Sequence, residues 1–382
     1  MSASTARPRI TVVTPWFPTN ASPGAGIFVL RDVELLAEHA EVTVVHVGAP
    51  QFFDADLANE PEWPGFRTVR APFAFSDYRS LAAAASAVRR ELRGAQLLHT
   101  MAMGALTPLV GTRVRVPWVH TEHWSGLLRD PEGSGRSRLV QRFLRRQLRR
   151  PDRVVAVSGF LAGALQRWSG SAPAVIGNAV MVPSVPVSDS AWDFSEVALL
   201  GVGAIADNKG PMEALETMIE LRRRGRSATL TWVGSGPLAQ RMRERAEEAG
   251  VAEHLRLPGQ LEPDAVAGEL AAADLFLLPT RFETFGVALA EAASAGLPIV
   301  TGDRGGFLDF LDSDSSRLVP VDRFGGPALA DAVEALVDDP ALPARTAIAS
   351  TAAERFDEGA RWERYARVYR EAGLRPPEAN GG

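Results

Sequence analysis

The stretch from Asp274 to Gly302, "DLFLLPTRFETFGVALAEAASAGLPIVTG", contains a strand, a loop, a helix and a second strand in that order. Its first and last runs, "DLFLLPT" and "LPIVTG", are short and apolar, as in strands that are buried on both faces of a parallel sheet. Between them we expect a helix that begins near Phe285 or Gly286 and is stopped by Gly296 and Pro298. Strand, crossing helix and strand form the repeating unit of a parallel α/β sheet.

The same alternation fills the rest of the chain. The first half contains the apolar runs "RITVVT", "EVTVVHV", "FRTVRA", "QLLHT", "VPWVHT" and "RVVAVS", and the second contains "VALLGVG", "ATLTWVG", "HLRLPG", "DLFLLPT", "LPIVTG" and "SRLVPV". Each set predicts one doubly wound sheet, and 382 residues suit two domains. Ligands of such sheets bind at the carboxyl ends of the strands. We therefore expect an α/β fold of two Rossmann-like domains that face a shared cleft.

The boundaries follow from composition. The segment "VMVPSVPVSDSA" has two prolines and no periodicity, which is typical of a linker. We predict a first domain at residues 1–179, a linker at 180–195 and a second domain at 196–360. A closing helix at 361–374 follows the second sheet, and the tail at 375–382 is expected to be disordered.

Bulk composition excludes several classes of protein. The net charge is −5, which argues against a nucleic-acid partner held by a generally basic surface. The chain has no cysteine, so it can form neither disulfides nor thiolate sites. The N-terminus lacks the apolar core of a signal peptide, and no run approaches the ~18 apolar residues of a spanning helix. We expect a cytoplasmic protein whose membrane contact, if it has one, is peripheral.

Lys209 is the only lysine in the chain, and every other Lys or Arg position is arginine. It follows the strand "VALLGVG" and precedes a helix whose Pro211 suits the first turn and whose Gly225 suits the end. A lysine at a helix N-terminus adds a compact charge to free backbone N–H groups, and together these favour a phosphate or diphosphate. The alternative is a solvated surface lysine.

Two other loops of the second half contain candidate ligand contacts. Gly234 and Gly236 follow "TWV", where they permit close approach to a ligand or form a plain tight turn. Glu283 lies just ahead of the predicted helix and Glu291 inside it, so the carboxylates are staggered by roughly 8 to 12 Å. Two carboxylates accept hydrogen bonds from two diols, as in a nucleotide sugar. The alternative is that one glutamate interacts with the dipole at the N-terminus of the helix and that the other is a solvated helix residue.

The first half offers weaker signals. Gly24 and Gly26 lie in the loop between the first strand and helix, where they hold a phosphate or acceptor or only turn the chain. His123 follows the strand "VPWVHT", and His120-x-x-His123 resembles a metal pair without a third ligand, so we predict no metal. We interpret the Asp-x-Asp triplets at 54–56 and 312–314 as solvated loops.

An arginine-rich stretch, "SRLVQRFLRRQLRRPDR", has apolar residues at helical spacing. We expect an ordinary packed helix in which these residues face the core. The alternative is a surface that also meets anionic lipid. The apolar residues are Leu139, Val140, Phe143, Leu144 and Leu148.

Taken together, these loops resemble glycosyltransferase family 4, retaining enzymes of the GT-B fold. The likeness runs from "TPWFP" through "HTEHW", "VVAVS" and "VIGNAV" to "VGSGP" and "ETFGVALAEAASAGLPIV". Its most specific element is E-x7-E, at Glu283 and Glu291. The resemblance implies that Glu283 contacts the donor sugar, Glu291 the ribose and Lys209 the diphosphate, and that His123 lies beside the transferred sugar. It also implies that the final helix crosses back onto the first domain.

The predicted catalytic residues are therefore His123, Lys209 and Glu283. The predicted donor-binding residues are Gly24, Gly26, Gly203, Ala204, Lys209, Gly234, Gly236, Gln260, Arg281, Glu283, Thr284, Phe285, Gly286 and Glu291. One departure matters: many members of the family have an arginine at the position of Ala204, and Arg281 is a candidate to replace its charge.

The resemblance implies a retaining transferase that moves a glycosyl group from a nucleoside diphosphate sugar, with UDP or GDP expected. The acceptor is a hydroxyl of a glycan, glycolipid or small molecule, and no metal or other cofactor is expected. One alternative is a non-catalytic donor-fold partner protein, which the alanine at 204 favours. Another is a GT-B sugar-nucleotide epimerase. A glycosidase pair and a dinucleotide-dependent dehydrogenase fit less well. The donor sugar, the acceptor and the oligomeric state are not specified by the sequence.

Overall fold

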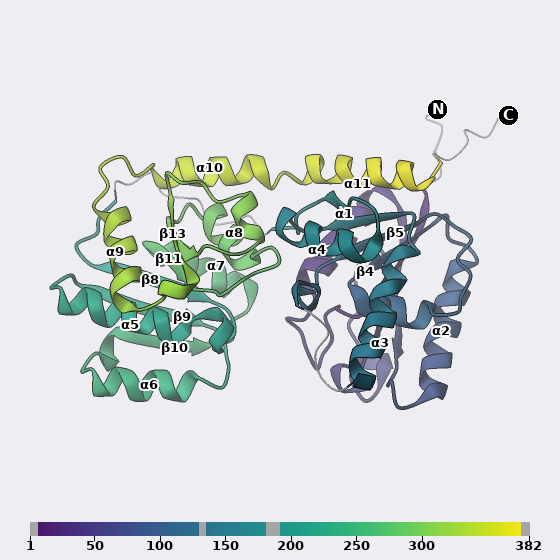
Figure 1. Cartoon of the computed structure of the whole chain (residues 1–382), viewed down its shortest axis with the longest axis horizontal. Helices are drawn as coiled ribbons and strands as arrows, with labels where there is room; N and C mark the ends of the chain where they lie inside the picture. Colours follow the sequence, from purple (N-terminus) through teal and green to yellow (C-terminus); the bar gives the residue numbers. More distant parts are fainter. Residues whose placement is uncertain (1–6, 130–134, 181–191, 376–382) are drawn as a thin grey trace. The chain divides into compact units, whose positions relative to one another are not determined.

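The structure is a computed structural model that describes residues 7–129, 135–180 and 192–375. The chain divides into two compact units (Figure 1). Unit 1 combines Met1–Ala179 with Glu358–Gly382, and unit 2 is Val180–Asp357. Most of the predicted linker and all but the first residue of the predicted tail lie outside the described residues.

Unit 1 is built on a parallel sheet of seven strands in the order β3-β2-β1-β4-β5-β6-β7. All six predicted strands are present, and the added strand, β7, has only two residues. The apolar runs form strands because both faces of the sheet are covered: every residue of β4 and β5 is buried. The strands are β1 Arg9–Thr14, β2 Glu41–Gly48, β3 Arg67–Pro72, β4 Leu97–Met101, β5 Trp118–Glu122, β6 Arg153–Ala156 and β7 Ala174–Val175.

Unit 2 contains a parallel sheet of six strands in the order β10-β9-β8-β11-β12-β13. The six predicted strands are all present, and β11 and β12 are buried along their whole length. The strands are β8 Val197–Val202, β9 Ala228–Val233, β10 Leu255–Gly259, β11 Leu275–Leu278, β12 Ile299–Gly302 and β13 Ser316–Val319. The prediction of two Rossmann-like parallel sheets is confirmed.

Strand order reverses once in each sheet, between β1 and β4 in unit 1 and between β8 and β11 in unit 2. At such a point the loops leave toward opposite faces of the sheet and open a crevice outside the carboxyl ends of the strands. The loops that follow β8 and β11 therefore border the expected ligand position of unit 2.

Helices cover the two sheets (Figure 1). Those of unit 1 are α1 Ile27–His39, α2 Tyr78–Leu92, α3 Gly135–Arg146, α4 Gly159–Ser169 and α11 Glu358–Ala372. Those of unit 2 are α5 Pro211–Arg223, α6 Ala239–Glu248, α7 Pro263–Ala272, α8 Val287–Ser294, α9 Gly326–Val337 and α10 Arg345–Arg355. Within the described residues, no helix has the length and apolar character needed to cross a membrane.

The closing helix α11 belongs to unit 1, where it packs beside α1 (Figure 1). Arg361 forms a buried ion pair with Asp32 of α1, and its Nε donates to the carbonyl of Gly177 at 2.8 Å. Tyr369 lies 2.9 Å from His99 Nδ1, and Tyr365 joins the same core. Removing either partner of a buried ion pair leaves an uncompensated charge, so the pair of Arg361 and Asp32 holds α11 against α1. The predicted return of the final helix to the first domain is confirmed.

The arginine-rich helix α3 corrects one expectation. Leu139, Val140 and Phe143 are exposed, so the prediction that they face the core is wrong. Arg145 is buried in their place, because carbonyl oxygens and two indole rings from other segments surround its guanidinium. Of the five predicted core residues, Leu148 is buried as expected and Leu144 is half-buried, so the sequence placed only the first three on the wrong face.

Candidate active site

Three loops of unit 2 meet beyond the carboxyl ends of β8, β11 and β12. The backbone N–H of Arg281, after β11, donates to the carbonyl of Asn208, after β8, at 2.9 Å. The N–H of Gly306, after β12, donates to the carbonyl of Glu283 at 2.9 Å. These contacts fix the loops to one another through the backbone, so their side chains share one location.

Lys209 and Glu283 form an ion pair at this location. Lys209 ends the short turn η6 (Asp207–Lys209), and its Nζ donates to Glu283 Oε1. The hydroxyl of Thr280 lies 3.2 Å from the same Oε1 and 3.1 Å from the carbonyl oxygen of Asn208, so it lies between the carboxylate and the loop after β8. The Lys209 side chain is 24% exposed and that of Glu283 is 16% exposed, so both remain within reach of a ligand. Sequence reasoning predicted the two charged groups but not Thr280.

The helix α8 begins after Gly286, which has a φ of +96°, in agreement with the predicted start. Glu291 lies inside the helix and is partly exposed. The ring of Phe285 is buried and packs on Phe310 and Phe356, and its predicted donor contact stays a prediction. The side chain of Phe285 is therefore a core group, and only its backbone is left for a ligand. Thr284 lies between Glu283 and Phe285 and is partly exposed.

The glycines after β9 have a packing role that the sequence did not reveal. A Cβ on Gly234 would lie 2.0 Å from the carbonyl oxygen of Gly203, and one on Gly236 would lie 2.4 Å from that of Ile205. The loops after β8 and β9 thus approach each other more closely than any side chain allows. Close approach of the chain to itself explains both glycines without a ligand, and their predicted donor contacts stay predictions.

Ala204 is exposed in the loop between β8 and η6. Arg281, the candidate for its missing charge, donates from Nη2 to Glu213 Oε1 of α5 at 2.9 Å. Its guanidinium is half exposed and already paired with a carboxylate. Gln260 is exposed directly after β10, where Gly259 accepts a hydrogen bond from the N–H of Gly234 at 2.8 Å.

Unit 1 carries the other predicted residues. Gly26 caps α1 with a φ of +71°, and a Cβ there would lie 2.4 Å from the backbone of Trp16. Only glycine fits such a position, so the fold itself requires Gly26. Gly24 is exposed two residues earlier in the same loop.

His123 follows β5 and is buried against the ring of Phe28, with 4.9 Å between ring centroids. Its Nδ1 lies 3.1 Å from the amide oxygen of Asn178, an atom that only accepts. Nδ1 therefore carries the proton, and Nε2 is a bare acceptor that has no partner within the described residues. Burial lowers the pKa of His123 to about 4, so the ring is neutral at physiological pH.

Glu122 positions this loop, and sequence reasoning missed it. Its fully buried carboxylate accepts from the backbone N–H of Met103, His123 and Trp124 at 3.3, 2.9 and 2.8 Å. A carboxylate that holds three amides fixes the loop more firmly than neutral hydrogen bonds do. The signal in the sequence was an acidic residue inside an otherwise buried strand.

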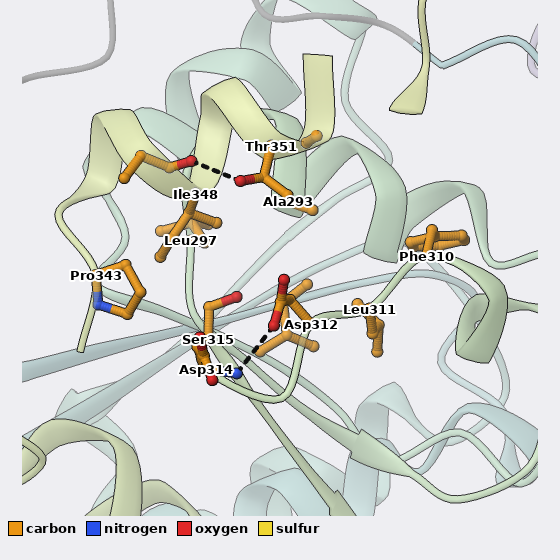
Figure 2. Close-up of a pocket in the computed structure, with 13 residues that line it drawn as sticks. Ala293, Leu297, Phe310, Leu311, Asp312, Asp314, Ser315, Pro343, Ile348 and Thr351 are labelled. Atoms are coloured by element: carbon orange, nitrogen blue, oxygen red, sulfur yellow. Dashed lines mark hydrogen bonds between the residues drawn. The ribbon is translucent and has the colours of Figure 1, made fainter. Parts of the chain in front are cut away.

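The metal-like pairs do not converge on a metal site. His120 is held by Thr100 at 2.9 Å and by Glu122 at 3.2 Å. Within the described ranges, no three His, Cys, Asp or Glu side chains cluster as metal ligands. In the second Asp-x-Asp triplet, the N–H of Asp314 donates to Asp312 Oδ1 beside a small, largely apolar pocket formed with α8 and α10 (Figure 2). This pocket lies near the start of β12 and β13, at the opposite edge of the sheet from Lys209.

Both units match the models of known protein families. The family described as "Glycosyltransferase Family 4" matches residues 22–182, and "Glycosyl transferases group 1" matches residues 190–355. The two matches cover both units. The chain belongs to the family 4 glycosyltransferases.

Curated relatives of this family 4 glycosyltransferase match over part of their length. An alpha-D-kanosaminyltransferase of Streptomyces kanamyceticus is 31% identical over 178 residues, which are 46% of each chain. A GDP-mannose-dependent alpha-(1-6)-phosphatidylinositol monomannoside mannosyltransferase of Mycobacterium tuberculosis is 32% identical over 142 residues, 35% of this chain and 37% of the relative. The matched segment thus spans less than half the length of these relatives.

Solved structures share the whole fold. Sucrose-phosphate synthase of Thermosynechococcus elongatus has a TM-score of 0.74 at 22% identity, covering 96% of this chain and 99% of that chain. Anabaena HepE in complex with UDP and glucose has a TM-score of 0.71 at 16% identity, covering 95% and 99%. At these identities the likeness establishes the GT-B fold of the family 4 glycosyltransferase.

Proposed function

We propose that this family 4 glycosyltransferase transfers a glycosyl group from a nucleoside diphosphate sugar to an acceptor hydroxyl, with retention of configuration. The observation that carries the proposal is the Lys209–Glu283 pair, which lies beside the Thr280 hydroxyl at the strand-order reversal of unit 2. A cation beside an acceptor carboxylate offers one group for a phosphate and one for sugar hydroxyls.

Donor binding would exchange the partners of this pair. In the proposed complex, Lys209 Nζ turns to the diphosphate and Glu283 accepts from hydroxyls of the sugar. Both side chains are partly exposed, so neither has to leave a buried position. Glu291, on the helix that follows, is proposed to accept from the ribose hydroxyls.

Charge stabilisation is the main chemical task. As the bond from the anomeric carbon to the phosphate oxygen breaks, negative charge accumulates on the diphosphate. Lys209 and the free N–H groups at the start of α5 would stabilise it, which makes a metal unnecessary in this proposal. The departing phosphate oxygen takes the proton of the acceptor hydroxyl, and that hydroxyl attacks from the same face. No enzymic nucleophile is needed.

His123 of unit 1 is proposed to accept a hydrogen bond from a hydroxyl of the transferred sugar. Its Nε2 is a buried acceptor with no partner among the described residues, and leaving such an atom unpaired is costly. A neutral imidazole suits this role, because a protonated ring would repel the positive charge that develops on the sugar.

The donor is proposed to be a UDP- or GDP-sugar. One relative is named for its dependence on GDP-mannose, and one structural neighbour is described with UDP and glucose. The acceptor is proposed to be a hydroxyl of a glycan, glycolipid or small molecule. The charge that the family places at position 204 would come from backbone N–H groups or from Arg281, once Arg281 leaves Glu213.

The test is product analysis with a panel of UDP- and GDP-sugars crossed with an acceptor pool. We expect a glycosylated product whose anomeric configuration, read by NMR, equals that of the donor. An inverted product would contradict the mechanism. A donor that changes without acceptor would instead identify an epimerase. Nucleotide binding with no turnover across the panel would favour the non-catalytic partner protein, which the alanine at 204 supports.

A further inference from the structure

The helix α3 turns an apolar stripe away from the protein. Leu139 and Phe143 are four residues apart and therefore lie on one face of the helix. They are 69% and 49% exposed, and Val140 beside them is 47% exposed. Such side chains are normally buried in a helix that packs on a core.

The buried face of α3 shows that this orientation is specified. Arg145 is 2% exposed, and its Nη1 and Nη2 donate to the carbonyls of Arg129 and Gly126 at 3.0 and 2.9 Å. Its guanidinium also lies 5.1 Å from the ring of Trp168. A half-turn rotation that buried Leu139 and Phe143 would expose Arg145 and break these contacts.

Arginines flank the exposed stripe. Arg142 and Arg146 are exposed and four residues apart, next to Leu139 and Phe143 on the helix surface. In the part of the chain that the structure describes, neither has a hydrogen-bond or ion-pair partner for its side chain. From residue 135 to residue 150 the sequence contains no Asp or Glu. Cations beside an outward apolar stripe are the pattern of a helix that lies in a membrane interface.

We propose that α3 docks unit 1 on an anionic lipid bilayer. Leu139 and Phe143 enter the boundary between headgroups and acyl chains, while Arg142 and Arg146 bind lipid phosphates. A second copy of the chain is a poor occupant, because a two-fold contact through this face would bring arginines against arginines. A layer of phosphates neutralises the same charges.

A second basic surface begins where α3 ends. Arg150 follows the short turn η5 (Gln147–Arg149) and donates to the carbonyls of Leu109 and Thr112. Thr112 lines an open groove of about 720 Å³, whose other lining residues include Arg89, Arg90, Arg93, Arg113 and Arg115. Arg89, Arg90 and Arg93 stand at the C-terminal end of α2, a position that favours cations in any helix. Arg113 and Arg115 come from a loop, so the helix does not account for them. The groove is a second concentration of arginine on unit 1.

The experiment is vesicle flotation of the full chain with two kinds of vesicle. One kind contains phosphatidylcholine alone, and the other contains equal parts of phosphatidylcholine and phosphatidylglycerol. We expect binding to the anionic vesicles only, weakened by salt. Leu139→Asp/Phe143→Asp should lower the partition coefficient more than about tenfold, since the apolar contact is lost. Phe52→Asp/Phe75→Asp is the matched control, with exposures of 51% and 71% in the same unit, and should lower it much less.

The arginines need a separate variant. Arg142→Gln/Arg146→Gln should lower partitioning into anionic vesicles about 25-fold, since each interfacial arginine contributes about fivefold. Arg241→Gln/Arg243→Gln, on exposed positions of α6, is the control with the same change in charge.

Several outcomes would overturn the proposal. They are failure of the native protein to float, equal binding to neutral vesicles, or undiminished binding of either α3 variant. Light scattering that shows a native dimer split by Leu139→Asp/Phe143→Asp would assign the face to a second copy instead. None of these readouts depends on glycosyl transfer, so the result stands apart from the proposed activity.

Discussion

Replacement of Lys209 by methionine removes the ammonium but keeps most of the apolar stem. In the ligand-free protein the lost contact is a partly exposed ion pair with Glu283, which stabilises the fold by about 1 kcal/mol or less. In the transition state the lost contact is a positioned cation beside a departing diphosphate, and such groups contribute about 2 to 4 kcal/mol. The two effects therefore differ in size.

The expected result is a fall in kcat/KM of about 30- to 900-fold, because each 1.36 kcal/mol is about tenfold in rate. The assay is the initial rate of transfer from the donor that the panel identifies, with urea unfolding to measure stability. Arg256→Met is the matched control: Arg256 is an exposed cation of the same unit and contacts Glu269. Undiminished turnover of Lys209→Met, or an equal loss in the control, would refute the role of Lys209.

Three further predictions concern the supporting residues. Glu122→Gln weakens the acceptor of three backbone N–H groups, so kcat should fall. Nucleotide affinity, measured by calorimetry, should stay unchanged. Loss of both kcat and nucleotide affinity would show that Glu122 is needed for folding in general. Burial lowers the pKa of His123 to about 4, so the unfolded chain takes up a proton at a higher pH than the folded chain. The free energy of unfolding should thus decrease as pH falls from about 6.5 to 4, by up to about 1.4 kcal/mol per pH unit. Urea unfolding at several pH values measures this dependence. If a His123→Asn variant lost stability with pH as steeply as the native protein, the prediction would be contradicted. Gly234→Ala places a Cβ 2.0 Å from the carbonyl oxygen of Gly203 and should lower the free energy of unfolding, measured in urea, by more than about 2 kcal/mol. The control Gly268→Ala lies in open space on α7 and should leave the free energy of unfolding unchanged or raise it. Equal effects of these two alanines would show that the loop contact is not needed.

The sequence predicted the sheets well because their signal is local. Among the residues that the structure describes, every strand of four or more residues corresponds to an apolar run, and the one strand that was missed is the two-residue β7. Lys209 and Glu283 were predicted to share a site for a simple geometric reason. Carboxyl ends of neighbouring parallel strands meet at one edge, and β8 and β11 are neighbours.

The remaining contacts depend on segments that are distant in the sequence. The partner of His123 is Asn178, 55 residues away, and no local pattern indicates that pairing. The close approach of Gly234 to Gly203 likewise exists only in the folded sheet. For α3, the helical period gave the helix, but its inward face is set by the carbonyls and rings around Arg145.

The most direct test of the account is calorimetric titration of the native protein and of Lys209→Met with UDP, GDP, ADP and dTDP. We predict that UDP or GDP binds the native protein with one site per chain, and that Lys209→Met binds the same nucleotide at least about tenfold more weakly, as expected for loss of a charged phosphate contact. Absence of binding by all four nucleotides, or equal affinity for the variant, would contradict a diphosphate site at Lys209.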